Sequence, residues 1–157
     1  MFQSLPTDAR PFAEWNWSQI EPYLHDLAGR PLTRQNVHAW LADWTHLSAL
    51  LYETYQRLYV ATTVNTVDLQ ANRHYQAFVS DIHPLAQAAD QKLKEKLLSS
   101  GLEPQGFEIP LRNLRSEADL FRQDNLPLLS DELNYWIEYD KIIGAQTVEW
   151  EGQETPI

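Results

Sequence analysis

The sequence predicts an all-α protein: a long antiparallel helical hairpin, shorter helices, and a possible small β-hairpin at the C-terminus. Three observations predict this fold. Apolar residues recur every three or four positions over two long stretches, Thr33 to Asn65 and Asp68 to Ser100. Almost no loop separates these stretches, so the chain must reverse sharply between them. Only after Gly144 does the apolar period change from helical to alternating.

Before the first long stretch we expect an irregular lead-in and one short helix. Residues 1–16 contain two prolines and predict the irregular segment. Ser18 is the candidate N-cap of a helix that ends near Ala28. Gly29 and Pro31 follow it, in the order expected where a helix stops.

The first long helix is predicted to begin at Thr33, a good N-cap residue. One apolar stripe contains Val37, Trp40, Leu41, Trp44, Leu47, Leu51, Tyr52, Tyr55, Leu58 and Tyr59. Apolar residues on the opposite face are Ala39, Ala42, Ala49, Leu50, Val60 and Val64. A helix with apolar groups on two faces is expected to have more than one packing partner.

The return helix is predicted to begin at Asp68, whose carboxylate suits an N-cap. Its apolar stripe contains Ala71, Tyr75, Phe78, Ile82, Leu85, Ala89, Leu93 and Leu97. Because the stripe continues in phase past Pro84, we expect a kink near Ser80–His83 and not a stop. Gly101 is expected to end the helix.

Downstream of the hairpin, residues 101–110 form a loop according to their glycine and proline content. A helix is predicted from Leu111 to about Gln123, and Pro127 interrupts the pattern. Ser130 is the candidate N-cap of a further helix.

Two alternating segments close the chain, Thr147–Trp150 and Gln153–Thr155, and Glu151-Gly152 between them is a plausible hairpin turn. We treat residues 1–157 as a single helical region. Its parts are the lead-in 1–16, the short helix and long hairpin 17–100, and the shorter helices and terminal hairpin 101–157.

Composition limits the classes of partner. The net charge of −10 repels nucleic acid and anionic membranes, so neither is an expected partner. The absence of cysteine excludes disulfides and thiolate metal sites. The N-terminus has neither a basic nor an apolar segment typical of a signal peptide, and no run of 18 apolar residues occurs. A cytoplasmic location is therefore expected.

No spacing of residues predicts an active site or a metal site. A helical zinc site needs two histidines about one turn apart, and His-Glu-x-x-His is absent. The five histidines lie at least eight positions apart: His25, His38, His46, His74 and His83. A structural or surface role is the expected one, and no catalytic, cofactor-binding or metal-binding residue is assigned.

Two carboxylate pairs and one aromatic series also have ordinary structural explanations. Glu138 and Asp140 are predicted on different helix faces, and Glu149 and Glu151 lie beside a turn. Residues 131–157 contain seven acidic residues and one lysine, typical of a solvated or partner-facing surface. The helically spaced aromatics are more typical of interhelix packing than of a ligand platform: Trp40, Trp44, Tyr52, Tyr55 and Tyr59.

Several segments, taken in order, are similar to a known family. They are WSQIEPYLHDLAGRPL, VHAWLADWTHLSALLYE, RLYVATTVNTVD, IHPLAQAADQKLKEKLL, RSEADLFRQDNLPL and EYDKIIGAQTVEWEGQE. This succession, from about Trp17 to Glu154, resembles the N-terminal region of the oligoendopeptidase F branch of the thimet-oligopeptidase-like zinc metallopeptidases. The NTVD turn and the last segment are its most specific parts.

The resemblance implies an almost wholly helical fold that encloses a channel in which short peptides are cut at a zinc ion. In that family the zinc is held by the two histidines of His-Glu-x-x-His and a further glutamate, and the motif's glutamate is the general base. These residues lie in the C-terminal half of the family, so none is carried over to this chain. The resemblance therefore implies an N-terminal piece that is inert alone.

Two functions from different classes follow as expectations. In the first, the chain is the N-terminal helical segment of an oligopeptide-cleaving zinc metalloendopeptidase, with the C-terminal catalytic half as its partner and zinc only in the complete protein. In the second, it is a stand-alone helical interaction module, and its acidic C-terminal region is the surface that contacts a partner. Apolar residues left over on the first long helix, and at Val148 and Trp150, suggest self-association of the isolated chain.

Overall fold

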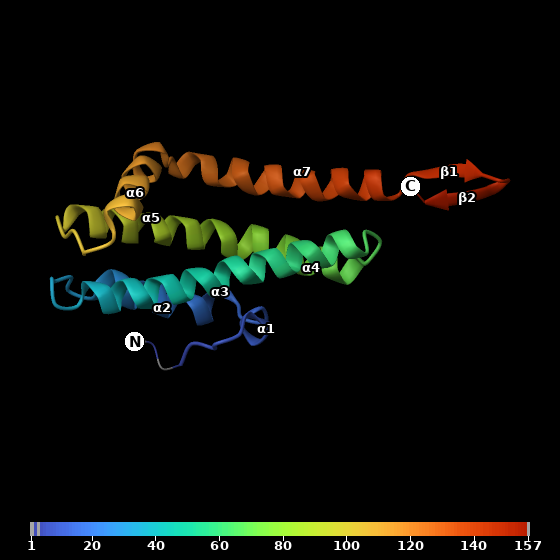
Figure 1. Cartoon of the computed structure of the whole chain (residues 1–157). Coiled ribbons are helices and arrows are strands. Elements are labelled where there is room, and N and C mark those ends of the chain that lie inside the picture. Colours follow the sequence, from blue (N-terminus) through green and yellow to red (C-terminus); the bar gives the residue numbers. More distant parts are fainter. Residues whose placement is uncertain (1, 3, 157) are drawn as a thin grey trace.

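The computed structural model describes Phe2 and residues 4–156, and helices dominate it, as predicted. Two long helical arms lie antiparallel, and a third long helix runs alongside the second arm (Figure 1). The helices are α1 (Ala9–Phe12), α2 (Trp17–Gly29), α3 (Val37–Val64), α4 (Leu69–Ala77), η1 (Phe78–Ile82), α5 (His83–Ser99), α6 (Glu108–Leu120), η2 (Gln123–Asn125) and α7 (Leu126–Gly144). The strands are β1 (Thr147–Trp150) and β2 (Gln153–Pro156).

The long hairpin turns where the sequence places it. Helix α3 ends at Val64, and the side chain of Asp68 accepts hydrogen bonds from the backbone N–H groups of Gln70 and Ala71 at 2.9 and 3.1 Å. This carboxylate satisfies amide groups that have no partner within the first turn of α4. The reversal therefore needs only the four residues 65–68.

The second arm changes its winding just before Pro84. Residues Phe78–Ile82 form a π-helical turn, in which the N–H of His83 bonds to the carbonyl of Phe78, five residues earlier. Pro84 then lies in the first turn of α5, where its missing N–H costs no helical bond. The irregularity lies where the kink was predicted, near Ser80–His83, but the predicted stripe does not continue in phase, because Leu85 is 45% exposed and Ala86 is buried instead.

One main core joins α1, α2, α3, α5 and α6. Its deepest members, all at most 1% exposed, are Ala9, Phe12, Ile20, Leu27, Trp40, Leu47, Leu93 and Leu97. The buried side of α3 differs in part from the predicted stripe. Leu50, expected on the opposite face, is only 3% exposed, whereas Tyr52, expected inside, is 68% exposed. Val60 and Val64 do lie exposed on the second face, as expected.

Several helix starts differ from the sequence prediction. Asn16, not Ser18, precedes α2 and forms a capping box with Gln19. Helix α3 starts at Val37 because the segment after Thr33 forms a turn, whose first amide hydrogen bonds go to the carbonyl of Thr33. Ser130 lies inside α7, because this helix already begins at Leu126. Pro127 lies in its first turn, where a proline is tolerated.

The lead-in and the first of the downstream helices also differ from expectation. The lead-in contains the short helix α1, whose Asp8 side chain accepts a hydrogen bond from the N–H of Arg10. Helix α6 begins at Glu108, inside the predicted loop, and its first turn accommodates Pro110 because this residue needs no N–H partner there.

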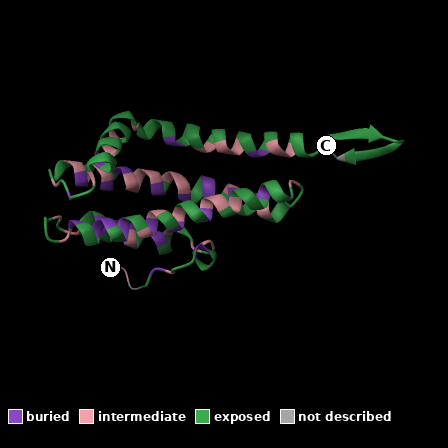
Figure 2. Ribbon diagram, in the orientation of Figure 1, coloured by how far each residue is buried: buried purple, intermediate pink, exposed green. Residues whose placement is uncertain are grey.

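Helix α7 and the β-hairpin lie at the edge of the molecule. Only Leu126 and Ile137 of α7 are buried, and the hairpin projects beyond the helices (Figures 1 and 2). A smaller apolar cluster, Tyr75, Val79 and Ile137, joins α7 to the second arm. The predicted strand pairing is confirmed, with Trp150 opposite Gln153 across the Glu151-Gly152 turn. Both turn residues have positive φ, 51° and 76°, which matches a type I′ turn.

Candidate functional site

A hollow with a volume of about 470 Å³ lies between α3, α5 and α7. We call it the interhelix cavity. Its apolar walls are Leu51, Phe78, Ala86, Leu129 and Leu133, with Tyr52 and Tyr55 as further aromatic walls. Its polar lining residues are Ser48, His83, Gln87, Asp90 and Glu132. The volume lies within the usual range of small-molecule sites.

The π-helical turn positions one end of this cavity. His83 follows it directly, and its ring stacks on Tyr55 with centroids 5.5 Å apart and an interplanar angle of 22°. The amide nitrogen of Gln87 lies 3.4 Å from His83 Nε2, and Tyr75 donates a hydrogen bond from its hydroxyl to that of Tyr55 at 3.2 Å. Burial lowers the pKa of His83, so this imidazole is neutral at physiological pH.

Two carboxylates in the cavity lining differ in their partners. Asp90 accepts a hydrogen bond from Trp44 Nε1 at 2.8 Å and pairs with Lys94 at 3.1 Å. Lys94 also pairs with Glu117 at 2.8 Å, so its charge is shared between α5 and α6. Glu132 of α7 has no hydrogen bond or ion pair to any other described residue. The charge left uncompensated in the cavity lining is therefore negative.

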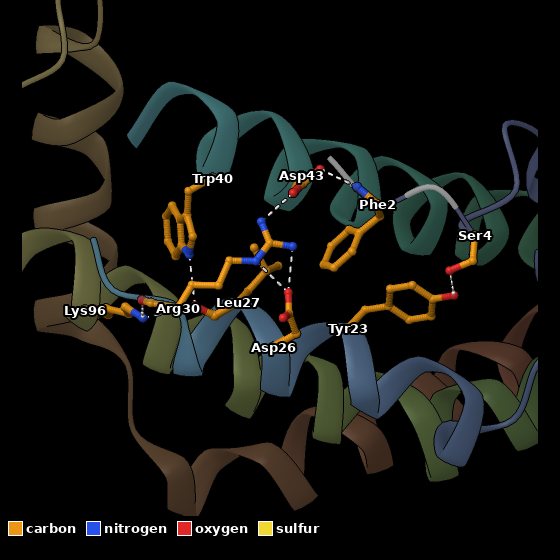
Figure 3. A network of polar contacts seen from close by, with 9 residues as sticks. All are labelled: Phe2, Ser4, Tyr23, Asp26, Leu27, Arg30, Trp40, Asp43 and Lys96. Carbon is orange, nitrogen blue, oxygen red and sulfur yellow. Dashed lines mark hydrogen bonds and ion pairs between the residues drawn. The ribbon is translucent and has the colours of Figure 1, made fainter. Parts of the chain in front are cut away.

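A second polar cluster, centred on Arg30, ties α2 to α3 and α5 (Figure 3). Arg30 forms ion pairs with Asp43 at 2.5 Å and with Asp26 at 2.6 Å, and Asp43 also accepts from the backbone N–H of Phe2. These hydrogen bonds outweigh the effect of burial and hold the pKa of Asp43 below its ordinary value. The cluster is thus a set of ion pairs around the buried carboxylate of Asp43.

Lys96 completes this cluster from α5. Its ammonium group donates hydrogen bonds to the carbonyl oxygens of Leu27, Ala28 and Arg30, at the C-terminal end of α2. Trp40 Nε1 also donates a hydrogen bond to the carbonyl oxygen of Leu27, at 2.9 Å. A cation at this end complements the helix dipole. Burial, together with the nearby Arg30, lowers the pKa of Lys96. The role of the cluster is to hold three helices together.

The histidines and carboxylate pairs considered as candidate site residues in the sequence do not form a common site in the structure. Within the described residues, no group of three histidine, aspartate or glutamate side chains is placed to hold a metal ion. Glu138 pairs with Lys141 at 2.7 Å, and Glu149 lies opposite Glu154 in the exposed β-hairpin. His83 is the histidine that lines the interhelix cavity.

The aromatic series of α3 divides into two groups and Tyr59, whose ring packs against Tyr75 with centroids 5.8 Å apart. Trp40 and Trp44 are 1% and 8% exposed and belong to the core, as packing residues should. Tyr52 and Tyr55 line the interhelix cavity instead. Gln87 and Glu132 were missed by sequence reasoning, because a hollow between three helices depends on how they pack and leaves no signal in the spacing along any one of them.

The arrangement at the interhelix cavity suits binding: apolar walls surround a few polar groups, one of them an unpaired carboxylate. Comparison of the chain with protein-family models, with curated proteins and with solved structures found no match. In the part of the chain that the structure describes, no helix combines the length and apolar character needed to cross a membrane.

Proposed function

We propose that this chain is the N-terminal helical segment of an oligopeptide-cleaving zinc metalloendopeptidase that acts in the cytoplasm. In this proposal the zinc ligands belong to a C-terminal catalytic half, and the helices described here form one wall of the peptide channel. The chain itself binds no zinc and is inert alone. The ordered resemblance of its segments to the oligoendopeptidase F branch supports this assignment.

The observation that carries the proposal is the apolar surface left open on α7 and the β-hairpin. We call it the α7 surface: Leu128, Tyr135, Trp136, Tyr139, Ile142, Ile143, Val148 and Trp150, each at least 43% exposed. Isolated exposed apolar residues are ordinary, but a continuous series along one helix marks an interface. A partner that covers this surface explains why the sequence places aromatics there.

The accessible area supports the same conclusion. The chain exposes 10477 Å², whereas a compact monomer of this mass exposes about 8,100 Å². The excess of about 2,300 Å² is as large as a stable protein interface. Helix α3 alone has 28 residues, hence a length of about 42 Å at ~1.5 Å per residue. Such dimensions suit one layer of a larger helical protein.

The test is whether a catalytic half completes this chain. We expect the coding sequence downstream of Ile157 to encode His-Glu-x-x-His and a further glutamate. The separately expressed downstream product should bind this chain, and its cleavage of a quenched fluorescent oligopeptide should increase on mixing. A matched pair of variants locates the contact: Trp136→Ser on the α7 surface should weaken the association, and Arg112→Ser on α6 should leave it unchanged.

Absence of the zinc motif from that coding sequence, or a downstream product that neither binds nor responds, would overturn the proposal. Tight zinc binding by this chain alone, measured by calorimetry, would contradict it as well. In the absence of the catalytic half, we expect the isolated chain to self-associate through the α7 surface, and analytical ultracentrifugation should show that Trp136→Ser reduces this association.

The alternative is a stand-alone helical interaction module. The observation in its favour is the main core, which joins α1, α2, α3, α5 and α6 and packs independently of α7. The module's acidic region, residues 131–157, would then contact a basic partner. A monomeric, highly stable chain with no affinity for a downstream product favours this alternative.

A further inference from the structure

We propose that the interhelix cavity is a binding site for a small organic amine, an ammonium group carried on an apolar body. This inference does not rest on the proposed peptidase function, and it concerns residues of this chain alone.

The shape and lining of the cavity favour an apolar body of limited size. Its volume of about 470 Å³ suits a small molecule, and its walls come from three helices, so the hollow exists only in the folded chain. Leu51, Phe78 and Leu133 are buried or half-buried at this position. An apolar group that enters is removed from water on several sides, which favours binding by the hydrophobic effect.

Charge decides which polar group the ligand carries. Asp90 is held by Trp44 and Lys94, so its charge is largely compensated. Glu132 has no partner among the described residues, and His83 is neutral. A cation bound here gains an ion pair with Glu132, whereas an anion meets a carboxylate with no neighbouring cation to balance it.

The aromatic lining adds to this preference. Tyr52 and Tyr55 stand one turn apart on α3 and both line the cavity. The face of a tyrosine ring attracts an ammonium group, a combination that proteins use to recognise organic amines. The π-helical turn at Phe78–Ile82 is a further feature often found beside binding sites, and it places Phe78 and His83 on the same cavity wall.

The experiment compares three ligands of similar shape and different charge: 2-phenylethylammonium, 2-phenylethanol and 3-phenylpropionate. Their binding to the purified chain is followed by ligand-observed NMR and by calorimetry. We expect the ammonium compound to bind most tightly, the alcohol more weakly, and the carboxylate weakest. Equal binding of all three, or no binding of the ammonium compound at millimolar concentration, overturns the proposal.

Matched variants locate the site. Glu132→Gln should weaken ammonium binding roughly three- to fivefold, the effect expected of a partly exposed ion pair, and leave alcohol binding unchanged. Asp131→Asn makes the same charge change one residue away, outside the cavity lining, and should have a smaller effect. An equal loss in both variants would show that the amine responds to general surface charge, and would overturn the site.

A second pair of variants tests the aromatic wall of the cavity. Tyr52 is 68% exposed, so Tyr52→Ala should fold normally and weaken ammonium binding about two- to fivefold. Tyr59→Ala is the control, because Tyr59 lies on the same helix outside the cavity lining. Unchanged binding in Tyr52→Ala counts against the proposal. Failure of these tests leaves the peptidase proposal untouched, since no measurement involves a catalytic half.

Discussion

At the scale of single residues, two buried polar side chains of α3 are in opposite situations. Asp43 is 1% exposed and is hydrogen-bonded and ion-paired with Arg30. Thr54 is fully buried, and its hydroxyl oxygen has no hydrogen-bond partner among the described residues. Burial of a polar group costs free energy that a hydrogen bond offsets, so Asp43 should stabilise the fold while the Thr54 hydroxyl weakens it.

Replacement of Thr54 by valine, which keeps the shape and removes the hydroxyl, should leave the free energy of unfolding unchanged or raise it by up to about 1 kcal/mol. The matched control is Thr62→Val, where the hydroxyl donates to Tyr59 O at 2.7 Å and its loss should cost about 1 kcal/mol. Urea titrations of both variants measure the difference. A large loss of stability in Thr54→Val would show that its hydroxyl does have a partner.

The ion pair of Asp43 should make stability depend on pH in the acid range. Its folded-state pKa lies below the ordinary value of 3.8, mainly because Arg30 donates to it and outweighs the effect of burial. The unfolded chain therefore takes up this proton first as the pH falls. The stabilising contribution is complete above pH 3.8 and disappears as the pH falls through the folded-state pKa.

Asp43→Asn should lower the free energy of unfolding by about 1–3 kcal/mol between about pH 5 and pH 7. The difference from the unmodified chain should shrink below pH 3.8. Denaturant titrations across this range measure it, with Asp119→Asn, an exposed position on α6, as the control that should show little effect. A difference that stays constant down to pH 2 would contradict the role given to Asp43.

At the scale of elements, the apolar period of α3 establishes a helix but leaves open which side is buried. Leu47 and Leu50 are 0% and 3% exposed, whereas Leu51 is half-buried and lines the interhelix cavity. The sequence grouped Leu51 with the core and Leu50 with the opposite face. Apolar residues occur on most sides of α3, so its neighbours, above all α1, α2 and α4, decide which side is buried.

The same comparison predicts unequal costs for two truncations on one helix. Leu47→Ala should lower the free energy of unfolding by about 2–5 kcal/mol, because it leaves a void inside the main core. Leu51→Ala should cost clearly less, since its side chain borders a hollow that already exists. Thermal and urea unfolding of both variants provide the measurement. Equal costs would show that Leu51 is packed as tightly as Leu47.

At the scale of the whole molecule, α7 spans the second arm and contacts the turn of the long hairpin at its far end. There Gly144 approaches Thr66 so closely that an added Cβ would lie 2.7 Å from Thr66 Cγ2. The opposite end of α7 is joined to α5 through α6. Because few side chains of α7 are buried between these ends, close approach at Gly144 is important for its placement.

Gly144→Ala should therefore destabilise the chain, although alanine is ordinarily favoured over glycine in a helix by about 1 kcal/mol. Thr66→Ala removes Cγ2 and Oγ1, which an added Cβ would approach to 2.7 and 2.9 Å, but leaves the Cβ of residue 66 at 3.2 Å, so Gly144→Ala should destabilise less in that background. Unfolding free energies of the two single variants and the double variant measure this difference between the two backgrounds. If Gly144→Ala stabilises the otherwise unmodified chain, α7 does not approach the turn as described.

The sequence by itself determined the helices other than α1, the sharp turn at residues 65–68, the irregularity before Pro84 and the terminal β-hairpin. Each depends on local physics: the spacing of apolar residues, the capping carboxylate of Asp68, the missing N–H of proline and the freedom of Gly152 at positive φ. Such interactions join residues a few positions apart, so their signals lie in short stretches of sequence.

Only the tertiary structure decided which face of α3 is buried, how far α7 lies open, and that Tyr52, His83 and Glu132 border one cavity. These residues come from three helices, and their proximity depends on interhelix packing, whose contacts join positions far apart in the chain. A hollow is also a place where packing is incomplete, which no pattern of apolar spacing along a single helix records. The candidate site therefore emerged only when the helices were placed together.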